Sequence, residues 1–145
     1  MATRAEVTAH LATWYDAPLA DAGIVATDTP GGLKEILDEA LRAMGTVDAS
    51  LAAAAPTDGA GFRALAEYHA MRRVVRKLQP RFNLAPGGGE NYSLRQAFEN
   101  AMILLREAEA RVILRFGTVN GLDTSTKFGV LIPVAEQSVV TVQAV

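Results

Sequence analysis

The amino-acid sequence predicts a mainly α-helical protein: a small helical bundle with a long C-terminal helix, followed by an extended or β-hairpin C-terminal arm. Apolar residues recur at helical spacing in several stretches before residue 117. Proline and glycine separate these stretches, as is typical of the turns between helices. After Gly117 the chain becomes rich in valine, threonine and glycine, and the first two favour extended structure. We therefore expect a helical bundle domain over residues 1–117 and an extended arm over residues 118–145.

The first helix is expected over about residues 3–16. Thr3 and Glu6 have the spacing of a capping box, in which each side chain accepts a hydrogen bond from the other residue's amide. Pro18 should end the helix, because the residue before a proline is driven out of the helical region. The apolar residues of this helix are Val7, Leu11 and Trp14.

A second helix is expected to begin at Thr29 as its N-cap, with Pro30 at the first helical position, where a missing amide hydrogen costs nothing. Gly45 is placed to close it. Charged residues fill one side of this helix and a continuous apolar stripe the other. The stripe consists of Leu33, Ile36, Leu37, Ala40, Leu41 and Met44.

Three further helices are expected before residue 117. A short alanine-rich helix covers residues 48–55, and a long one covers residues 58–79, ended by Pro80. A glycine-bearing loop over residues 81–91 leads to the last helix, residues 93–116, which Gly117 terminates. The inner stripe of the 58–79 helix is Phe62, Leu65, Tyr68, Met71, Val75 and Leu78, and that of the last helix is Leu94, Phe98, Ala101, Leu105, Ala108 and Val112.

Three apolar residues of the last helix, Ile103, Leu104 and Ile113, lie off its inner stripe. A helix that is apolar on more than one side either lies centrally in its own domain or packs against another chain.

The tail contains two β-prone segments, residues 128–134 and 139–145. Two strands alone are marginally stable in water. The segments therefore either add strands to a partner's sheet or fold back over the helices, and both alternatives stay open. The apolar residues expected to form an interface are Phe128, Val130, Ile132, Val134, Val139, Val140 and Val142.

Charge is unevenly distributed along a chain whose net charge is only −2. Residues 1–60 hold nine acidic and three basic residues, and residues 61–115 hold five acidic and ten basic ones. The densest basic stretch is either a solvated helix face balanced by the acidic half of a neighbouring subunit or a surface for nucleic acid. It consists of Arg72, Arg73, Arg76, Lys77 and Arg81.

Composition argues against catalysis and against cofactor or metal binding. The chain has no cysteine, and neither His10 nor His69 has a carboxylate or a second histidine at i+4, so both are expected to be surface or structurally satisfied residues. Apolar runs fall short of the roughly 20 residues that a membrane helix needs, and the N-terminus lacks the core of a signal peptide. We expect a soluble protein that is not an enzyme and carries no cofactor.

The order of the helical stretches carries a resemblance to a known family. A TRAEVTAHL helix is followed by a loop and the GLKEILDEALRAM helix, and EYHAMRRVVRKL leads through a glycine-bearing loop into NYSLRQAFENAMILLREAEARV. Over roughly residues 1–116 this arrangement resembles the head–tail adaptor proteins of tailed bacteriophages, also called connector or head completion proteins.

The resemblance implies a structural protein of the virion neck, assembled in the host cytoplasm. Members of the family form a homo-oligomeric ring, usually of twelve copies, under the portal protein. The ring is a platform to which a stopper or tail-completion protein attaches, and DNA passes through the central channel of the ring. On this chain, residues 118–145 would form an arm that reaches the portal or a neighbouring copy. Subunit contacts would be made by Ile103, Leu104 and Ile113. The basic cluster would face the channel or an adjacent subunit.

Two other function classes remain open. The first is a small helical DNA-binding or packaging accessory protein that uses the basic cluster over residues 72–81, whose affinity for DNA would fall steeply with salt. The second is a helical enzyme domain whose site the sequence pattern does not reveal.

Overall fold

The computed structural model describes residues 1–84 and 89–117, and the side chains within 1–80 and 93–117. Its elements are α1 (Arg4–Trp14), α2 (Asp16–Asp21), α3 (Lys34–Ala43), the 3₁₀ helix η1 (Asp48–Ala53), α4 (Gly59–Leu84) and α5 (Gly89–Phe116). The described residues contain no strand, so the prediction of a mainly helical fold is confirmed for them. The predicted strands at 128–134 and 139–145 lie outside the described residues.

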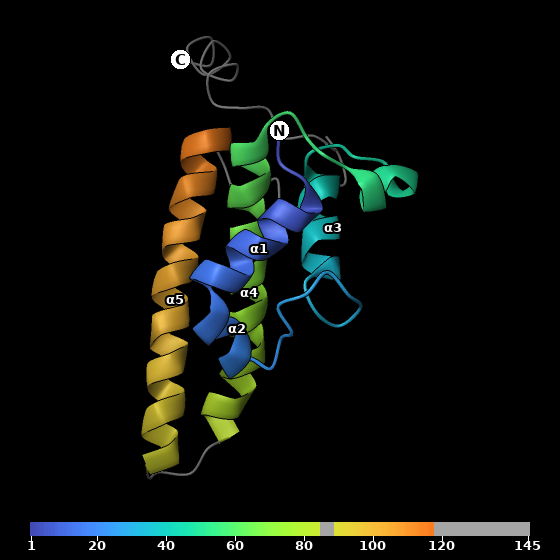
Figure 1. Cartoon of the computed structure of the whole chain (residues 1–145). Coiled ribbons are helices and arrows are strands. Elements are labelled where there is room, and N and C mark those ends of the chain that lie inside the picture. The colour runs from blue at the N-terminus through green and yellow to red at the C-terminus, as the bar shows by residue number, and fades with distance from the viewer. Residues whose placement is uncertain (85–88, 118–145) are drawn as a thin grey trace, which may run out of the picture.

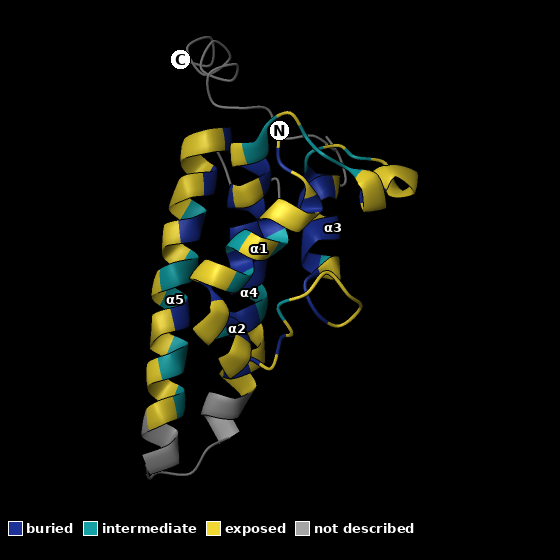
Figure 2. Cartoon of the chain, viewed as in Figure 1, coloured by how far each residue is buried: buried dark blue, intermediate teal, exposed yellow. Residues whose placement is uncertain are grey.

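The two long helices α4 and α5 run antiparallel, side by side, and form the long axis of the molecule (Figure 1). α1 and α2 cross this pair on one side, while α3 packs against α4 away from α5. α4 is therefore the central helix and contacts every other α-helix. Buried residues line the surfaces that these helices turn toward one another (Figure 2).

The core is built on the apolar stripe of α4. All six residues predicted for this stripe are buried, and Phe62, Leu65 and Met71 are completely so. The stripe predicted for α3 is also buried, apart from the half-buried Met44. Burial of one such large side chain contributes roughly 1.5–3 kcal/mol, so these two helices supply much of the stability of the fold.

Local sequence signals set several helix ends as predicted. The Thr3 amide donates to Glu6 Oε2 at 2.7 Å and the Glu6 amide donates to Thr3 Oγ1 at 3.2 Å, which is the expected capping box. Gly45 closes α3 with φ +89°, and the amides of Gly45 and Thr46 donate to the carbonyls of Arg42 and Leu41. This is the Schellman arrangement, in which glycine adopts the left-handed conformation without a steric penalty. Gly117 ends α5 with φ +82°.

The prediction that Pro18 ends the first helical region is wrong. α1 ends at Trp14, Tyr15 leaves the helical conformation, and a new helix, α2, begins at Asp16 and includes Pro18 as its third residue. The first four amides of a helix have no partner within the helix, so a proline there loses no hydrogen bond.

The predicted start of the second helix at Thr29 is also wrong, because α3 begins at Lys34. The preceding residues form tight turns in which the Leu33 amide donates to the Thr27 carbonyl at 2.8 Å. Gly31 has φ +82°, which is incompatible with a right-handed helix, and a Cβ on Gly32 would lie 2.7 Å from the Thr27 carbonyl oxygen. The two glycines therefore serve the turn rather than the first helical turn.

Pro80 does not end α4, which continues to Leu84, and α5 begins at Gly89 rather than near Ser93. A proline removes one backbone donor and crowds one carbonyl, but the surrounding hydrogen bonds of a long helix remain. The extensive packing of α4 along α5 favours continuation of both helices toward their connection. The loop predicted over residues 81–91 is correspondingly shorter.

Candidate interaction surfaces

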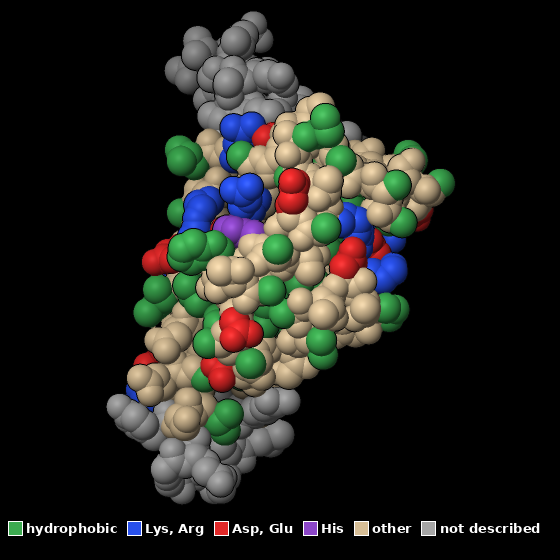
Figure 3. Space-filling model, in the orientation of Figure 1, with side chains coloured by type: hydrophobic (Ala, Val, Ile, Leu, Met, Phe, Trp, Pro, Cys, Tyr) green, Lys and Arg blue, Asp and Glu red, His purple; other side chains and the backbone are tan. Residues whose placement is uncertain are grey.

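α5 has a buried inner side and an exposed outer side, on which a few large apolar residues stand among charged and polar ones. Ala101, Ala108 and Val112 of the predicted inner stripe are buried against the other helices, whereas Leu94, Phe98 and Leu105 are only half-buried. On the outer side Ile103 is 53% exposed, Ile113 47% and Leu114 79%. We call these three residues the α5 ridge. In Figure 3 apolar side chains are visible along the edge that α5 forms.

Leu114 was not among the residues that the sequence pattern assigned to an interface. The available signal was its spacing: Leu114 follows Ile103 by eleven residues, close to three full turns at 3.6 residues per turn. The two side chains therefore belong to one side of α5. Ile113 lies about a quarter-turn away, at the border of that side.

A groove of about 340 Å³ lies between α2 and α5. It brings together two residues predicted from sequence, Ile103 and the half-buried Leu104, beside Pro18 of α2. Its polar rim is formed by Asp21 and Asn100. The groove lies where the side of α5 that carries Ile103 meets α2.

The structure gives different surroundings to the members of the predicted basic cluster on α4. Arg73 faces α3, where its guanidinium lies 3.5 Å from Glu39 Oε1 and 4.0 Å from Glu35 Oε2. The Arg72 guanidinium lies 6.0 Å from the centre of the Tyr68 ring, within the range of a cation–π contact. Arg76 and Lys77 are exposed and make no ion pair with the described residues.

The remaining predicted site residues cannot be placed beside these surfaces. The side chain of Arg81 lies outside the described residues. So do all seven apolar residues proposed for the arm, from Phe128 to Val142.

Both histidines have carboxylate partners that lie far away in sequence. His10 Nε2 is 2.6 Å from Oε1 of the buried Glu67, whose Oε2 accepts from Arg111 at 3.2 Å. This network joins α1, α4 and α5, and Figure 3 shows basic side chains around a histidine on that side of the molecule. On the other side of α4, His69 Nδ1 is 3.3 Å from Glu39 Oε2. The hydrogen bond with His69 lowers the Glu39 pKa, against the effect of burial.

The His10–Glu67 pair has the geometry of a base held by a carboxylate, but the described residues add no nucleophile to it. The other ring nitrogen of His10 makes no hydrogen bond in the described part of the chain. Residues 1–84 and 89–117 also contain no group of three or more metal-binding side chains. The two contacts satisfy the buried Glu67 carboxylate and connect three helices.

Glu67→Gln is expected to lower the free energy of unfolding by about 1.5–3 kcal/mol, because two hydrogen bonds to a charged group are replaced by weaker ones at a buried position. Burial, assisted by the Glu67 charge, raises the Tyr15 pKa to about 12, so the tyrosine ultraviolet titration should also shift toward lower pH in this variant. Urea unfolding and absorbance titration measure the two effects. Glu99→Gln, in an exposed pair with Arg95, should cost less than about 1 kcal/mol. Equal effects of the two substitutions would contradict the assignment.

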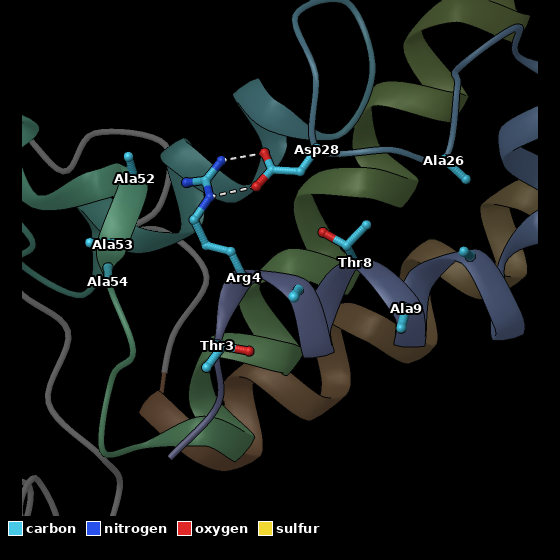
Figure 4. Close-up of a pocket in the computed structure, with 11 residues that line it drawn as sticks. Thr3, Arg4, Thr8, Ala9, Ala26, Asp28, Ala52, Ala53 and Ala54 are labelled. Atoms are coloured by element: carbon cyan, nitrogen blue, oxygen red, sulfur yellow. Dashed lines mark hydrogen bonds and ion pairs between the residues drawn. The ribbon is translucent and has the colours of Figure 1, made fainter.

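A buried arginine holds the N-terminal part of the fold together. The Arg4 guanidinium forms a two-pronged pair with Asp28 at 2.8 and 2.6 Å (Figure 4). Its Nη1 also lies 2.6 Å from Asp38 Oδ1. The same nitrogen donates to the Leu51 carbonyl at 3.2 Å. Arg4 therefore connects α1, the segment before α3, α3 itself and η1. The Asp28 hydrogen bond is the main cause that raises the Arg4 pKa above its ordinary value.

Comparison with known proteins finds no relative: no family model, no curated protein and no solved structure matches this chain. In residues 1–84 and 89–117 no helix combines the length and apolar character needed to cross a membrane. The class that the described fold defines is an α-helical bundle whose last helix carries exposed large apolar residues on its outer side.

Proposed function

We propose that this chain is a head–tail adaptor of a tailed bacteriophage, a non-enzymatic structural protein that forms a homo-oligomeric ring under the portal. In this role it offers a platform to a stopper or tail-completion protein around the DNA channel, and its place is the neck of the virion. Twelve copies is the ring order expected from the resemblance.

The observation that carries the proposal is the two-sided character of α5. Its buried residues complete the core, while Ile103, Ile113 and Leu114 remain exposed. Ile113 and Leu114 are adjacent, and Ile103 lies about three turns away on the side of Leu114. Large apolar side chains that gather on one exposed side of a helix are typical of an interaction site, since their contact with water is unfavourable. An assembling structural protein needs such a surface.

The mass of the full chain in solution, measured by light scattering with and without a candidate portal ring, tests this proposal. We expect either a ring of about twelve times 15.4 kDa or stoichiometric capture by the portal. A chain that remains a 15.4 kDa monomer at all concentrations and does not bind the portal would contradict the proposal.

The alternative is a DNA-binding or packaging accessory protein, and the exposed Arg76 and Lys77 are the observation that favours it. If this alternative holds, the double change Arg76→Ala and Lys77→Ala will weaken duplex binding and reduce its salt dependence, because fewer phosphate contacts release fewer counterions. For an adaptor we expect weak duplex binding at physiological salt and little effect of the two substitutions. Fluorescence anisotropy over a salt series distinguishes the outcomes, with Arg95→Ala on the exposed side of α5 as the control.

A further inference from the structure

The segment between α2 and α3 forms a loop on the side of the bundle (Figure 1). We call its residues 25–31 the strap. Most of the strap is exposed, and Val25 is exposed to 60%. Buried residues lie at both of its ends, Ile24 before it and Gly32 and Leu33 after it. The strap is therefore anchored at its ends and lies largely in solvent between them.

Local hydrogen bonds give the strap its shape. The Leu33 amide donates to the Thr27 carbonyl at 2.8 Å, and the Gly32 amide donates to the Thr29 carbonyl at 2.9 Å. The hydroxyl oxygens of Thr27 and Thr29 lie 2.9 Å apart. These contacts join residues within the segment and its C-terminal end. They persist when the strap moves as a unit.

Asp28 is the clasp that holds the strap against the bundle. Its carboxylate accepts hydrogen bonds from Nε and Nη2 of Arg4 at 2.8 and 2.6 Å (Figure 4). Within residues 1–84 and 89–117, no other hydrogen bond joins the strap to α1, η1 or α4. The Gly31 amide donates to Glu35 Oε1 at 3.1 Å, which holds that end of the strap to α3. The connection to α1 therefore depends on Asp28.

The Arg4 guanidinium has supports that do not belong to the strap. Its Nη1 donates to Asp38 Oδ1 at 2.6 Å and to the Leu51 carbonyl at 3.2 Å. The whole residue is buried. The edge formed by Nε and Nη2 therefore keeps its direction when Asp28 moves away. Such an edge binds both oxygens of one carboxylate, because its two N–H groups are parallel.

The Arg4–Asp28 pair also lies between two hollows. Together with Ala52 it lines a hollow of about 670 Å³ beside α1 and another of about 410 Å³ beside α3. Ala26 of the strap lines the first of them. Movement of Asp28 away from Arg4 joins the two hollows and brings solvent to the Nε–Nη2 edge.

From these contacts we infer that the strap opens without unfolding of the helical bundle, and that the Arg4 edge it uncovers is a binding site for a carboxylate group. In the closed state Asp28 occupies this site. A ligand on the same chain has a high effective concentration, so an external carboxylate competes poorly until Asp28 is removed. The device does not depend on the adaptor role.

Thiol labelling of the full chain measures the opening, because the sequence contains no cysteine. Ala26→Cys places a half-buried thiol on the strap, and Ala43→Cys places a buried one at the end of α3. Adding Asp28→Ala should speed labelling of the first thiol about tenfold or more, because charge-assisted hydrogen bonds are lost, and leave the second unchanged. If circular dichroism shows that Asp28→Ala is not folded, Asp28→Asn takes its place in this experiment.

The other results of the labelling experiment overturn the inference. Equal acceleration at both positions would show that Asp28 holds the whole bundle together rather than the strap. Unchanged labelling of both thiols would show that the strap stays closed without its clasp.

Rescue by an added carboxylate tests the binding site. In the chain with Asp28→Ala and Ala26→Cys, formate should slow thiol labelling and raise the melting temperature, relative to chloride at the same ionic strength. With Ala26→Cys alone formate should have no such effect, because Asp28 fills the site. Asp48→Ala, which removes the partner of the exposed Arg42, is the matched control for the melting temperature. Formate that acts no better than chloride, or that stabilises the control equally, would overturn the site assigned to Arg4.

Discussion

Arg4→Ala is expected to lower the free energy of unfolding by about 3–5 kcal/mol, the range observed when one partner of a buried ion pair is removed. Arg4 is 7% exposed and satisfies the carboxylates of both Asp28 and Asp38. Without it, Lys34, at 2.9 Å, is the remaining charged partner of the buried Asp38 among the described residues. Urea unfolding followed by circular dichroism measures the loss.

Arg42→Ala is the matched control for this prediction. Arg42 pairs with Asp48 at 2.9 Å, but both side chains are largely exposed, so the substitution should cost less than about 1 kcal/mol. Replacing the charges together, with Arg4→Met, Asp28→Asn and Asp38→Asn, should recover part of the loss, because no unpaired charge is then left in the interior. An Arg4→Ala variant as stable as Arg42→Ala would contradict the role assigned to this cluster.

The same cluster predicts how stability depends on acid. Burial opposes ionisation of Asp38, but hydrogen bonds from Lys34 and Arg4 outweigh it and lower the Asp38 pKa below its ordinary value of 3.8. The ionised carboxylate therefore stabilises the folded state fully above the ordinary pKa, and this contribution is lost as the pH falls through the lower folded value. Asp38→Asn should flatten the decline of stability on acidification below pH 3.8, measured by urea unfolding at successive pH values.

Phe116→Ala should also cost about 3–5 kcal/mol, as is usual for truncation of a fully buried phenylalanine. Phe116 is the last residue of α5 and packs against the start of α4, where a Cβ added to Gly61 would lie 2.9 Å from its ring. The neighbouring Arg115 pairs with Asp58, whose carboxylate also accepts from the Gly61 amide at 3.0 Å. The substitution should loosen the end of α5 from which residues 118–145 continue.

Leu114→Ala provides the comparison for Phe116→Ala, two residues away on the same helix. Leu114 is exposed, so its truncation should change stability by no more than about 0.5 kcal/mol. It should nevertheless weaken assembly if the α5 ridge is an interface. Urea unfolding and light scattering on the two variants separate folding from association, and a large stability loss in Leu114→Ala would show that its side chain belongs to the core.

Residues that act within one helix were predictable from the sequence. The buried stripe of α4, the capping box at Thr3 and the closing role of Gly45 all depend on neighbours within a few residues. The errors lie at Pro18, Thr29 and Pro80, where a local signal for a helix end or start competed with other interactions. At Pro18 the signal itself was ambiguous, because the same residue type is tolerated in the first turn of a new helix.

The candidate surfaces were predictable only in part. Ile103 and Ile113 could be recognised because they depart from the inner stripe of their own helix, and both are exposed. A groove of about 670 Å³ lined largely by alanines could not be recognised from the sequence. Its lining comes from α1, from the segment before α3 and from η1, and alanine carries no signal for a site. The basic cluster is continuous in sequence but is divided in space, because Arg73 faces α3 while Arg76 and Lys77 are exposed.

The helical class of the described residues, the apolar stripes and several helix ends follow from the sequence, because hydrophobic periodicity and capping are local properties. The partners of Arg4 and His10 followed only from the tertiary structure. Arg4 meets Asp38 across 34 positions and His10 meets Glu67 across 57, distances over which no spacing rule applies. The packing of the helices determines which charges are buried, which are paired and which surfaces stay apolar. Packing does this because it brings together residues that are far apart in the sequence.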